Sequence, residues 1–139
     1  MILITRPKEQ SKNLETAINL KGHKTFLESL YKIKYYKAKV SYNKNNYYIF
    51  PSIHSVHSLI SSKQIQKFRE ANILVIGKKV KHALVDIGCK KIILTAVDSD
   101  ALVKKISKPE FKKNNYVYLC SNIVNTDFLN RFYILLSLK

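Results

Sequence analysis

The hydrophobic positions in the middle of the chain change spacing several times, and this change predicts strands and helices in alternation. Residues 73–76 form an apolar run that ends at Gly77, as a buried strand does before a tight turn. Across 80–87 the apolar residues recur at every third or fourth position, which is the spacing of one helix face. A second apolar run follows at 92–94, and a further helix at 98–106. This order is typical of a parallel α/β domain.

The same segment predicts a core and the ends of its helices. We expect its inward-facing side chains to be buried together in one parallel-sheet core: Val80, Leu84, Ile87, Ile92, Leu94 and Leu102. Gly88 stands where a residue in the left-handed conformation ends the first helix. Asp98 or Ser99 is expected to cap the second helix.

The N-terminal residues predict one strand and one helix. The strand is 2–4, and Pro7 stands in the first turn of the helix, where the missing N–H of proline costs nothing. Gly22 ends this helix. The apolar stripe that we expect to be buried on it consists of Leu14, Ala17 and Ile18. Residues 26–36 alternate loosely between apolar and polar positions, which predicts a long strand or an extended connector.

Residues 37–46 are polar and predict a loop or linker before the next strand. That strand is expected at 47–50, followed by a helix with Ser52 at its N-cap. Ser61 or Ser62 is then expected to cap a shorter helix. The apolar residues expected to face the core are Ile53, Val56 and Ile60 in the first of these helices, and Ile65 and Phe68 in the second.

The last third of the chain predicts one more strand and a final helix. A polar turn at 108–115 precedes a strand at 116–120, and Thr126 with Asp127 can start the helix. One face of this helix is apolar: Phe128, Phe132, Leu135 and Leu136. Such a face is expected to pack against another element.

Composition restricts the class of protein. The 139 residues are 46% hydrophobic, which is enough for the core of one domain and too much for a disordered chain. No apolar run approaches the roughly 20 residues that span a bilayer, and the first residues lack the hydrophobic region of a signal peptide. Cys89 and Cys120 lack the spacing of a zinc site or disulfide framework, so we expect reduced, packed thiols. These features predict a soluble, cytoplasmic protein.

The charge is strongly positive, with 25 Lys and Arg against 9 Asp and Glu and a formal net charge of +16. A polyanionic partner is one explanation, either nucleic acid or a small molecule rich in carboxylate or phosphate. Composition is the other, because the chain is also rich in Asn, Ile and Tyr, which share adenine- and thymine-rich codons with Lys. The lysines are spread along the chain, whereas nucleic-acid surfaces usually cluster Arg. We favour the compositional cause and do not expect nucleic acid as the partner.

Local motifs offer little catalytic chemistry. The chain has 3 glycines, and it has no glycine-rich phosphate loop, nucleophile elbow or paired-carboxylate pattern. His54 and His57 are three positions apart, which is compatible with metal binding, but no acid or Cys lies near them in sequence. We therefore interpret them as solvent-exposed histidines. Arg6 lies between a strand and a helix, where it can bind an anion or bond neighbouring carbonyl groups.

Five short segments carry a family resemblance, at 2–7, 49–56, 75–80, 98–102 and 118–122. Their sequences are Ile-Leu-Ile-Thr-Arg-Pro, Ile-Phe-Pro-Ser-Ile-His-Ser-Val, Val-Ile-Gly-Lys-Lys-Val, Asp-Ser-Asp-Ala-Leu and Tyr-Leu-Cys-Ser-Asn. In order and spacing they resemble the short marks of the uroporphyrinogen-III synthase family. The chain departs from these marks at three positions: Pro51 and Val80 replace Thr, and Ser121 replaces Gly.

The resemblance implies two α/β domains joined by extended segments, with the active site in the cleft between them. It implies a lyase of porphyrin and heme biosynthesis that closes the linear tetrapyrrole hydroxymethylbilane, with loss of water and inversion of the last pyrrole ring. It also implies that no cofactor or metal is used. The substrate-binding positions carried over from the family are Arg6, Ser52, Gly77, Lys78 and Val80. No catalytic residue is assigned.

On this interpretation, residues 1–36 are a βα unit and connector of an incomplete first domain, and residues 37–139 are the second α/β domain without its last strand. Family chains are longer, and their late Tyr, a candidate proton donor, would lie beyond Lys139. We therefore expect a truncated synthase of weak activity whose partner is the small-molecule bilane, with no membrane partner. The alternative is a non-enzymatic, basic α/β domain that binds nucleic acid or an acidic partner.

Overall fold

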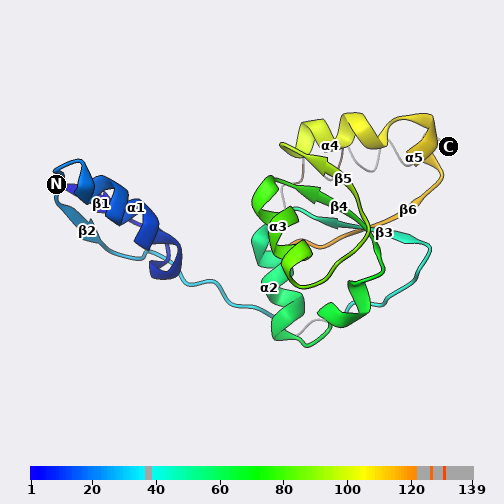
Figure 1. The fold of residues 1–139 in the computed structure, drawn as a ribbon, viewed down its shortest axis with the longest axis horizontal. Helices are drawn as coiled ribbons and strands as arrows, with labels where there is room; N and C mark the ends of the chain where they lie inside the picture. The colour runs from blue at the N-terminus through cyan, green and yellow to red at the C-terminus, as the bar shows by residue number, and fades with distance from the viewer. Residues whose placement is uncertain (37–38, 122–125, 127–129, 131–139) are drawn as a thin grey trace. The chain divides into compact units, whose positions relative to one another are not determined.

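The computed structural model describes residues 1–36, 39–121, 126 and 130. The chain divides into two compact units, Met1–Lys34 and Tyr35–Lys139. The first contains a two-stranded sheet and the second a four-stranded sheet (Figure 1). The apolar residues expected on the final helix lie outside the described residues: Phe128, Phe132, Leu135 and Leu136.

The first unit is a βαβ unit with a parallel pair of strands. Strand β1 (Ile2–Ile4) leads through helix α1 (Lys8–Leu20) to strand β2 (Thr25–Leu27). Helix α1 begins after Pro7, as expected, and Gly22 follows it with a φ of 81°. A residue with a Cβ is strained at this φ, so glycine suits the turn into β2.

Only a small part of the first unit is buried. Ile4 is buried, and the buried Ser11 donates a hydrogen bond from Oγ to the Pro7 carbonyl oxygen at 3.1 Å. The stripe expected on α1 is not buried: Leu14 and Ala17 are exposed and Ile18 is half-buried. That prediction was wrong because two three-residue strands offer α1 too little surface to cover its stripe.

The second unit is built on a parallel sheet with the strand order β5-β4-β3-β6. Its elements in chain order are β3 (Asn46–Phe50), α2 (Ile53–Ser61), the 3-10 turn η1 (Ile65–Phe68), β4 (Asn72–Ile76), α3 (Lys78–Asp86), β5 (Ile92–Ala96), α4 (Ser99–Ile106), α5 (Pro109–Lys112) and β6 (Asn115–Tyr118). All three described strand pairs of this sheet are parallel. The α/β class with a parallel sheet is therefore confirmed.

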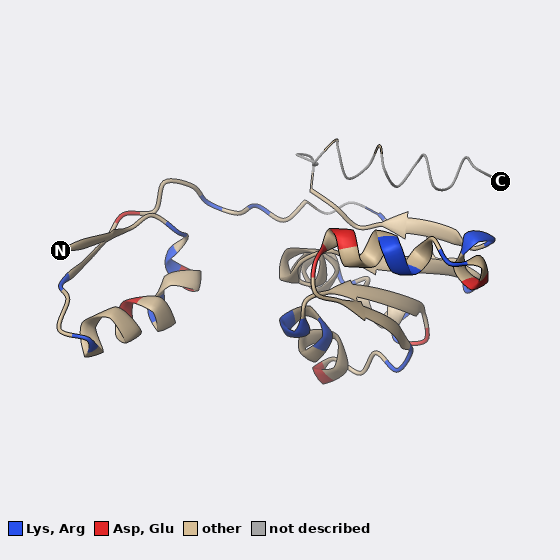
Figure 2. Ribbon diagram, turned by 90° about the horizontal axis from the view of Figure 1, so that it is seen from above, with Lys and Arg blue, Asp and Glu red and all other residues tan. Residues whose placement is uncertain are grey.

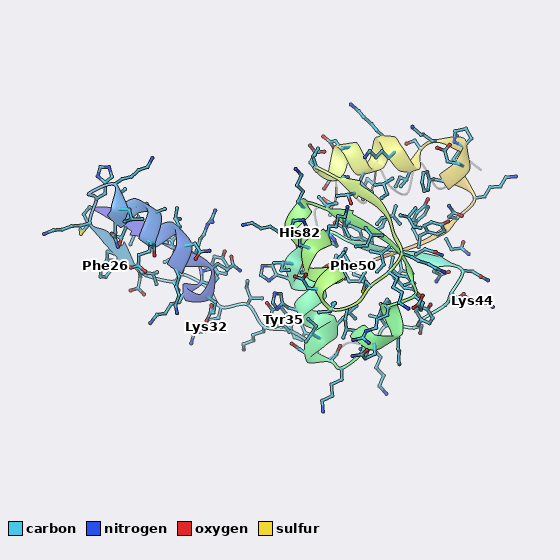
Figure 3. All side chains as sticks on the ribbon, in the orientation of Figure 1. Phe26, Lys32, Tyr35, Lys44, Phe50 and His82 are labelled. Carbon is cyan, nitrogen blue, oxygen red and sulfur yellow. The ribbon has the colours of Figure 1, made fainter. Side chains whose placement is uncertain are left out.

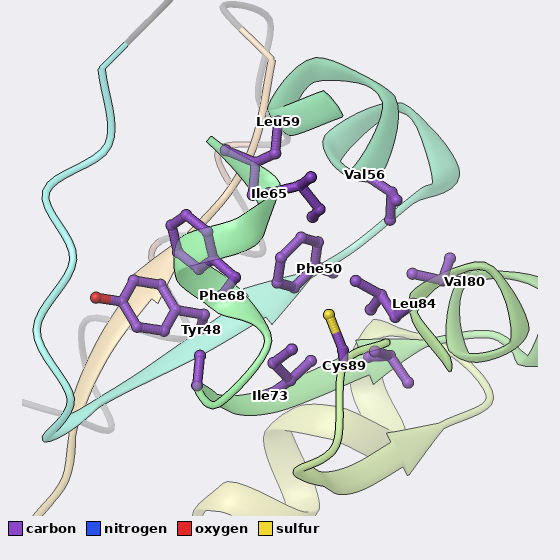
Figure 4. Close-up of a cluster of buried hydrophobic side chains, with 12 residues drawn as sticks. Tyr48, Phe50, Val56, Leu59, Ile65, Phe68, Ile73, Val80, Leu84 and Cys89 are labelled. Carbon is purple, nitrogen blue, oxygen red and sulfur yellow. The ribbon is translucent and has the colours of Figure 1, made fainter. Parts of the chain in front are cut away.

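Helices cover both faces of this sheet, so it has two cores. Neighbouring residues of a strand point to opposite faces. On one face, Tyr48, Phe50 and Ile73 pack beneath α2, η1 and α3 (Figure 4). On the other face, Ile49 and Leu74 pack beneath α4 and α5.

The single core predicted for the middle segment is therefore wrong. Its six side chains divide between the two clusters: Val80, Leu84, Ile87 and Ile92 on the α2 and α3 face, and Leu94 and Leu102 on the α4 face. Ile87, Ile92 and Leu94 are only half-buried. A continuous apolar strand supplies both faces of a parallel sheet, so its residues cannot all meet in one cluster.

Helix α2 buries a different stripe from the expected one. Val56 is buried as expected, and Ile53 is half-buried against the same core. Leu59, however, takes the place of Ile60, which is 42% exposed. The buried face is thus turned by one position, because α2 packs on β3 and η1 together.

The short helix predicted after α2 is the 3-10 turn η1, which begins after Gln64. Ile65 and Phe68 are buried, as expected. The capping prediction was wrong, because Ser61 is still part of α2. Ser62 Oγ donates back to two carbonyl oxygens of α2 instead.

Three further predictions, on the α4 cap and on residues 26–36 and 108–115, can be compared with the structure. Asp98 rather than Ser99 caps α4, since its carboxylate accepts a hydrogen bond from the Ala101 N–H at 2.8 Å. Of residues 26–36, only the first two belong to a strand, which favours the connector interpretation. The predicted polar turn at 108–115 contains the short helix α5.

Replacing Gly88 with alanine should destabilise the second unit by about 1–2 kcal/mol. Gly88 ends α3 with a φ of 88°, and a Cβ there would lie 3.4 Å from Arg69 Nε. That Nε donates to the Ile87 carbonyl oxygen at 3.1 Å, which keeps the guanidinium in place. Urea unfolding measures the loss. Gly77→Ala is the matched control, because its φ is 91° and a Cβ there meets nothing within 4 Å. A Cβ at 3.4 Å makes an ordinary van der Waals contact, so the two variants should lose similar stability through their shared φ. A loss confined to Gly88→Ala would show instead that Arg69 is displaced.

Candidate functional site

The carboxyl ends of the parallel strands form one edge of the second unit, and expected site residues lie along it. Ser52 follows β3 and Gly77 follows β4. Phe50 pairs with Val75, so extending the register by two residues places Ser52 beside Gly77. The register of β3 with β6 places Ser121 on the other side of Ser52. We call the row Ser121, Ser52 and Gly77 the carboxyl edge.

The chain changes faces of the sheet between β3 and β6. From β3 it continues into α2 on one face, and it reaches β6 from α4 and α5 on the other face. Ligands of open α/β sheets bind outside the carboxyl ends of the strands, where the strand order reverses in this way. The carboxyl edge therefore lies where this architecture usually holds its ligand.

Helix α2 begins at this edge without a side-chain cap. Ser52 occupies the N-cap position, as expected, but its hydroxyl makes no cap hydrogen bond. Its carbonyl oxygen accepts from Ser55 Oγ at 2.6 Å and from the Ser55 N–H at 3.2 Å. The first N–H groups of a helix lack partners within the helix, and an anion can satisfy them.

Helix α3 begins one strand away, also without a side-chain cap, because its N-cap is Gly77. The Gly77 N–H donates to the Ala96 carbonyl oxygen at 2.8 Å, which fixes the turn against β5. Lys78 follows and is exposed. A cation at the positive end of a helix dipole is unfavourable by itself, and a bound anion would relieve the repulsion.

Val80 occupies the remaining predicted position in this part of the chain, and its side chain is buried in the core beneath α2 and α3. Val80 can therefore contribute only its backbone N–H, in the first turn of α3, to a ligand at the carboxyl edge. Val80 thus contributes a core contact, and its side chain has no hydroxyl to offer a ligand.

Helix α4 differs from α2 and α3, because its own Asp98 carboxylate caps it. A carboxylate at this position accepts from the N–H groups that an external anion would otherwise bind. The carboxyl edge consequently has two uncapped helix starts on neighbouring strands, and a third start that is already occupied.

Arg6 belongs to the first unit, whereas the other expected site residues belong to the second: Ser52, Gly77, Lys78 and Val80. Its side chain is exposed. Its carbonyl oxygen accepts hydrogen bonds from Ser11 Oγ at 3.3 Å and Ser29 Oγ at 3.0 Å. The backbone of Arg6 is therefore structural, while its guanidinium lies on the surface at the start of α1.

The two histidines of α2 form a cluster that the sequence did not predict. Tyr35 lies beside helix α2 (Figure 3). Its hydroxyl lies 3.1 Å from His54 Nδ1, and its ring stacks on the His57 ring with a centroid distance of 5.9 Å. His57 is exposed, as expected, but His54 is half-buried. Burial first, and the neighbouring His57 second, lower the pKa of His54 below its ordinary value of 6.5.

The cysteines occupy different environments. Cys89 is buried, and this burial raises the pKa of its thiol, with Arg69 opposing the shift. Cys120 is exposed, so the expectation of two packed thiols was wrong for this residue. Among the described residues, no group of three or more His, Cys, Asp or Glu is arranged to hold a metal ion.

A scan of protein-family models and a search of curated proteins both find no match to this chain. Within the part of the chain that the structure describes, no helix has the length and apolar character needed to cross a membrane. The features of the chain that bear on function are therefore the carboxyl edge and the five segments that resemble the synthase family.

Proposed function

We propose that this chain binds a linear tetrapyrrole at the carboxyl edge and takes part in its closure to uroporphyrinogen III. The observation that carries the proposal is the pair of uncapped helix starts on neighbouring strands, at Ser52 and Gly77, with Lys78 beside them. Hydroxymethylbilane carries acetate and propionate groups along its length, so two neighbouring anion positions suit it better than one.

The reaction depends more on positioning of the substrate than on reactive side chains. The bilane loses its terminal hydroxyl as water and forms an azafulvene, whose electrophilic carbon must then meet a carbon of the last pyrrole ring. Holding both carbons in reacting geometry is the main catalytic demand. In the proposed role, the first N–H groups of α2 and α3 bind carboxylates of the bilane, and Lys78 supplies the opposite charge.

The product isomers test this proposal. Hydroxymethylbilane that closes without an enzyme gives the isomer without inversion, so protein is incubated with bilane and the isomers are separated. We expect bilane binding with only a small excess of the inverted isomer over a buffer control. In the synthase family two domains form the walls of the cleft, whereas the first unit of this chain is a single βαβ unit. An inverted fraction equal to the control, together with no binding, would contradict the proposal.

Reversing the charge at Lys78 should weaken bilane binding about tenfold, because it replaces a charge-assisted contact with repulsion at an uncapped helix start. Lys78→Glu is compared with Lys91→Glu, an identical change at an exposed residue before β5, at the opposite edge of the sheet. Fluorescence or calorimetric titration with freshly prepared bilane measures both affinities. Equal losses would indicate general charge attraction instead of a site at the carboxyl edge.

The same titrations test the alternative, a basic domain that binds nucleic acid. Lys and Arg are distributed over both units and are not confined to one element (Figure 2). Binding of a nucleic acid would fall steeply with salt and would respond similarly to Lys78→Glu and Lys91→Glu. A salt-sensitive gel shift at physiological ionic strength, without bilane binding, would favour this alternative.

A further inference from the structure

The junction between the two units is attached to α2 by an aromatic cluster. Tyr35 is the first residue of the second unit. Its ring lies 5.9 Å from the His57 ring at 22°, and 6.2 Å from the His54 ring at 31°. Its hydroxyl makes the hydrogen bond with His54 Nδ1 at 3.1 Å. Two side chains one helical turn apart thus hold one tyrosine.

The next attachment points lie further along the same helix. Ser58 Oγ donates to the Tyr36 carbonyl oxygen at 3.5 Å, a weak contact. The Val40 N–H donates to Gln64 Oε1 at 2.9 Å, just beyond the end of α2. Among the described residues of the segment 35–40, Tyr35 is therefore the first firm anchor and Val40 is the second.

We propose that Tyr35, His54 and His57 form a pH-sensitive clasp that is closed at neutral pH and opens in acid. When the clasp opens, the first firm anchor of the second unit moves from Tyr35 to Val40. An extended chain from Tyr35 to Val40 reaches about 17 Å, so opening lengthens the free connector between the units by up to this distance.

The sign of the pH dependence follows from the burial of His54. Closing the clasp covers His54 and favours its neutral form. In the neutral tautomer that carries its proton on Nε2, Nδ1 is the acceptor for the Tyr35 hydroxyl 3.1 Å away. The depressed pKa of His54 agrees with this direction. A group whose pKa is lowered in the closed state stabilises that state above its ordinary pKa, and loses the effect as the pH falls. The clasp should therefore weaken as the pH drops below about 6.5.

The surrounding charges favour the same direction. Helix α3 packs against α2. The Lys, Arg, His, Asp and Glu side chains on the neighbouring described segments are Lys34 and Lys39 on either side of Tyr35 in the chain, and Lys78, Lys79, Lys81, His82 and Asp86 on α3. All but Asp86 are basic, and His54 also lies in the first turn of α2, where the helix dipole disfavours a positive charge. Protonation of His54 therefore gains little from its surroundings while the clasp is closed.

Nuclear magnetic resonance of the full chain tests the clasp through the histidine pKa values and the backbone order parameters of residues 35, 36, 39 and 40. In the unmodified protein, we expect His54 to titrate below 6.5 and the order parameters of these residues to fall as the pH is lowered from 8 to 5. Tyr35→Ala should raise the pKa of His54 towards its ordinary value, because it uncovers the ring but leaves His57 in place, and it should leave residues 35 and 36 mobile at every pH. Tyr36→Ala, which removes a neighbouring and more exposed ring, is the matched control and should change neither.

A second variant separates titration from contact. In His54→Gln, the amide oxygen can still accept from the Tyr35 hydroxyl but does not titrate, so the connector should remain ordered in acid. Unchanged spectra of the β3 and β4 amides show that the fold is intact. The proposal is overturned if His54 titrates identically with and without Tyr35. It is also overturned if acid mobilises the connector equally in His54→Gln and in the unmodified protein.

Discussion

Replacing Phe68 with alanine should lower the free energy of unfolding of the second unit by about 3–5 kcal/mol. Phe68 is fully buried in η1, and its ring makes edge-on contacts with three others. The centroid distances are 4.9 Å to Tyr48, 5.7 Å to Tyr42 and 6.4 Å to Phe50. Removing it leaves a cavity between η1 and β3 and removes three aromatic contacts at once.

Urea unfolding, followed through amide resonances of β3 and β4, measures this loss. A domain is stable by only about 5–15 kcal/mol, so the variant should unfold at a much lower urea concentration or be partly unfolded in buffer. Phe26→Ala makes the same chemical change at a side chain that is 54% exposed in the first unit, and it should leave the second unit unaffected. A loss below about 1 kcal/mol for Phe68→Ala would mean that the surrounding rings repack.

Placing lysines on the open face of the first sheet should abolish self-association of the chain. Leu3 and Phe26 are direct partners in the register of β1 and β2, so they share one face of the sheet. They are 59% and 54% exposed, respectively, whereas Ile4, on the opposite face, is buried. Parallel sheets are normally covered on both faces, so this uncovered pair should drive association with another apolar surface.

Sedimentation over a range of concentrations compares the unmodified chain with the Leu3→Lys, Phe26→Lys double variant. The unmodified chain should associate with increasing concentration, and the variant should not. The control is Leu30→Lys with Tyr31→Lys, which adds the same charge at exposed apolar residues outside the sheet. If both double variants dissociate equally, charge repulsion is sufficient and the sheet face has no special role.

The strands and the class of the sheet were predictable because local sequence determines them. The run at 73–76 is apolar at every position, which is typical of a strand buried on both faces, and β4 is such a strand. The edge positions were predictable for the same reason, since Ser52 and Gly77 each follow such a run. The division of the apolar residues between two cores could not be predicted, because a continuous apolar run does not show which residue points to which face of the sheet.

Other features depend on distant contacts and could not be predicted. The choice of Leu59 over Ile60 depends on η1, which packs against α2 from the following turn. The contact between Tyr35 and His54 joins a connector to a helix across nineteen positions, and neither local sequence carries a signal for it. The spacing of His54 and His57 indicated a shared helix face, but it did not indicate that a tyrosine would occupy that face.

The central position of β3 also determines the order in which the sheet can assemble. Tyr47 pairs with Asn72 in β4, whereas Asn46 pairs with Asn115 in β6, so the second pairing closes a much longer loop. Longer loops cost more entropy to close, and distant pairings form more slowly. Strands β3, β4 and β5 should therefore assemble first and leave one side of β3 without a neighbour until β6 is made. During that interval β3 is an open strand edge that can accept β6 from another copy of the chain, and exchange of this strand is the expected misfolding route at high concentration.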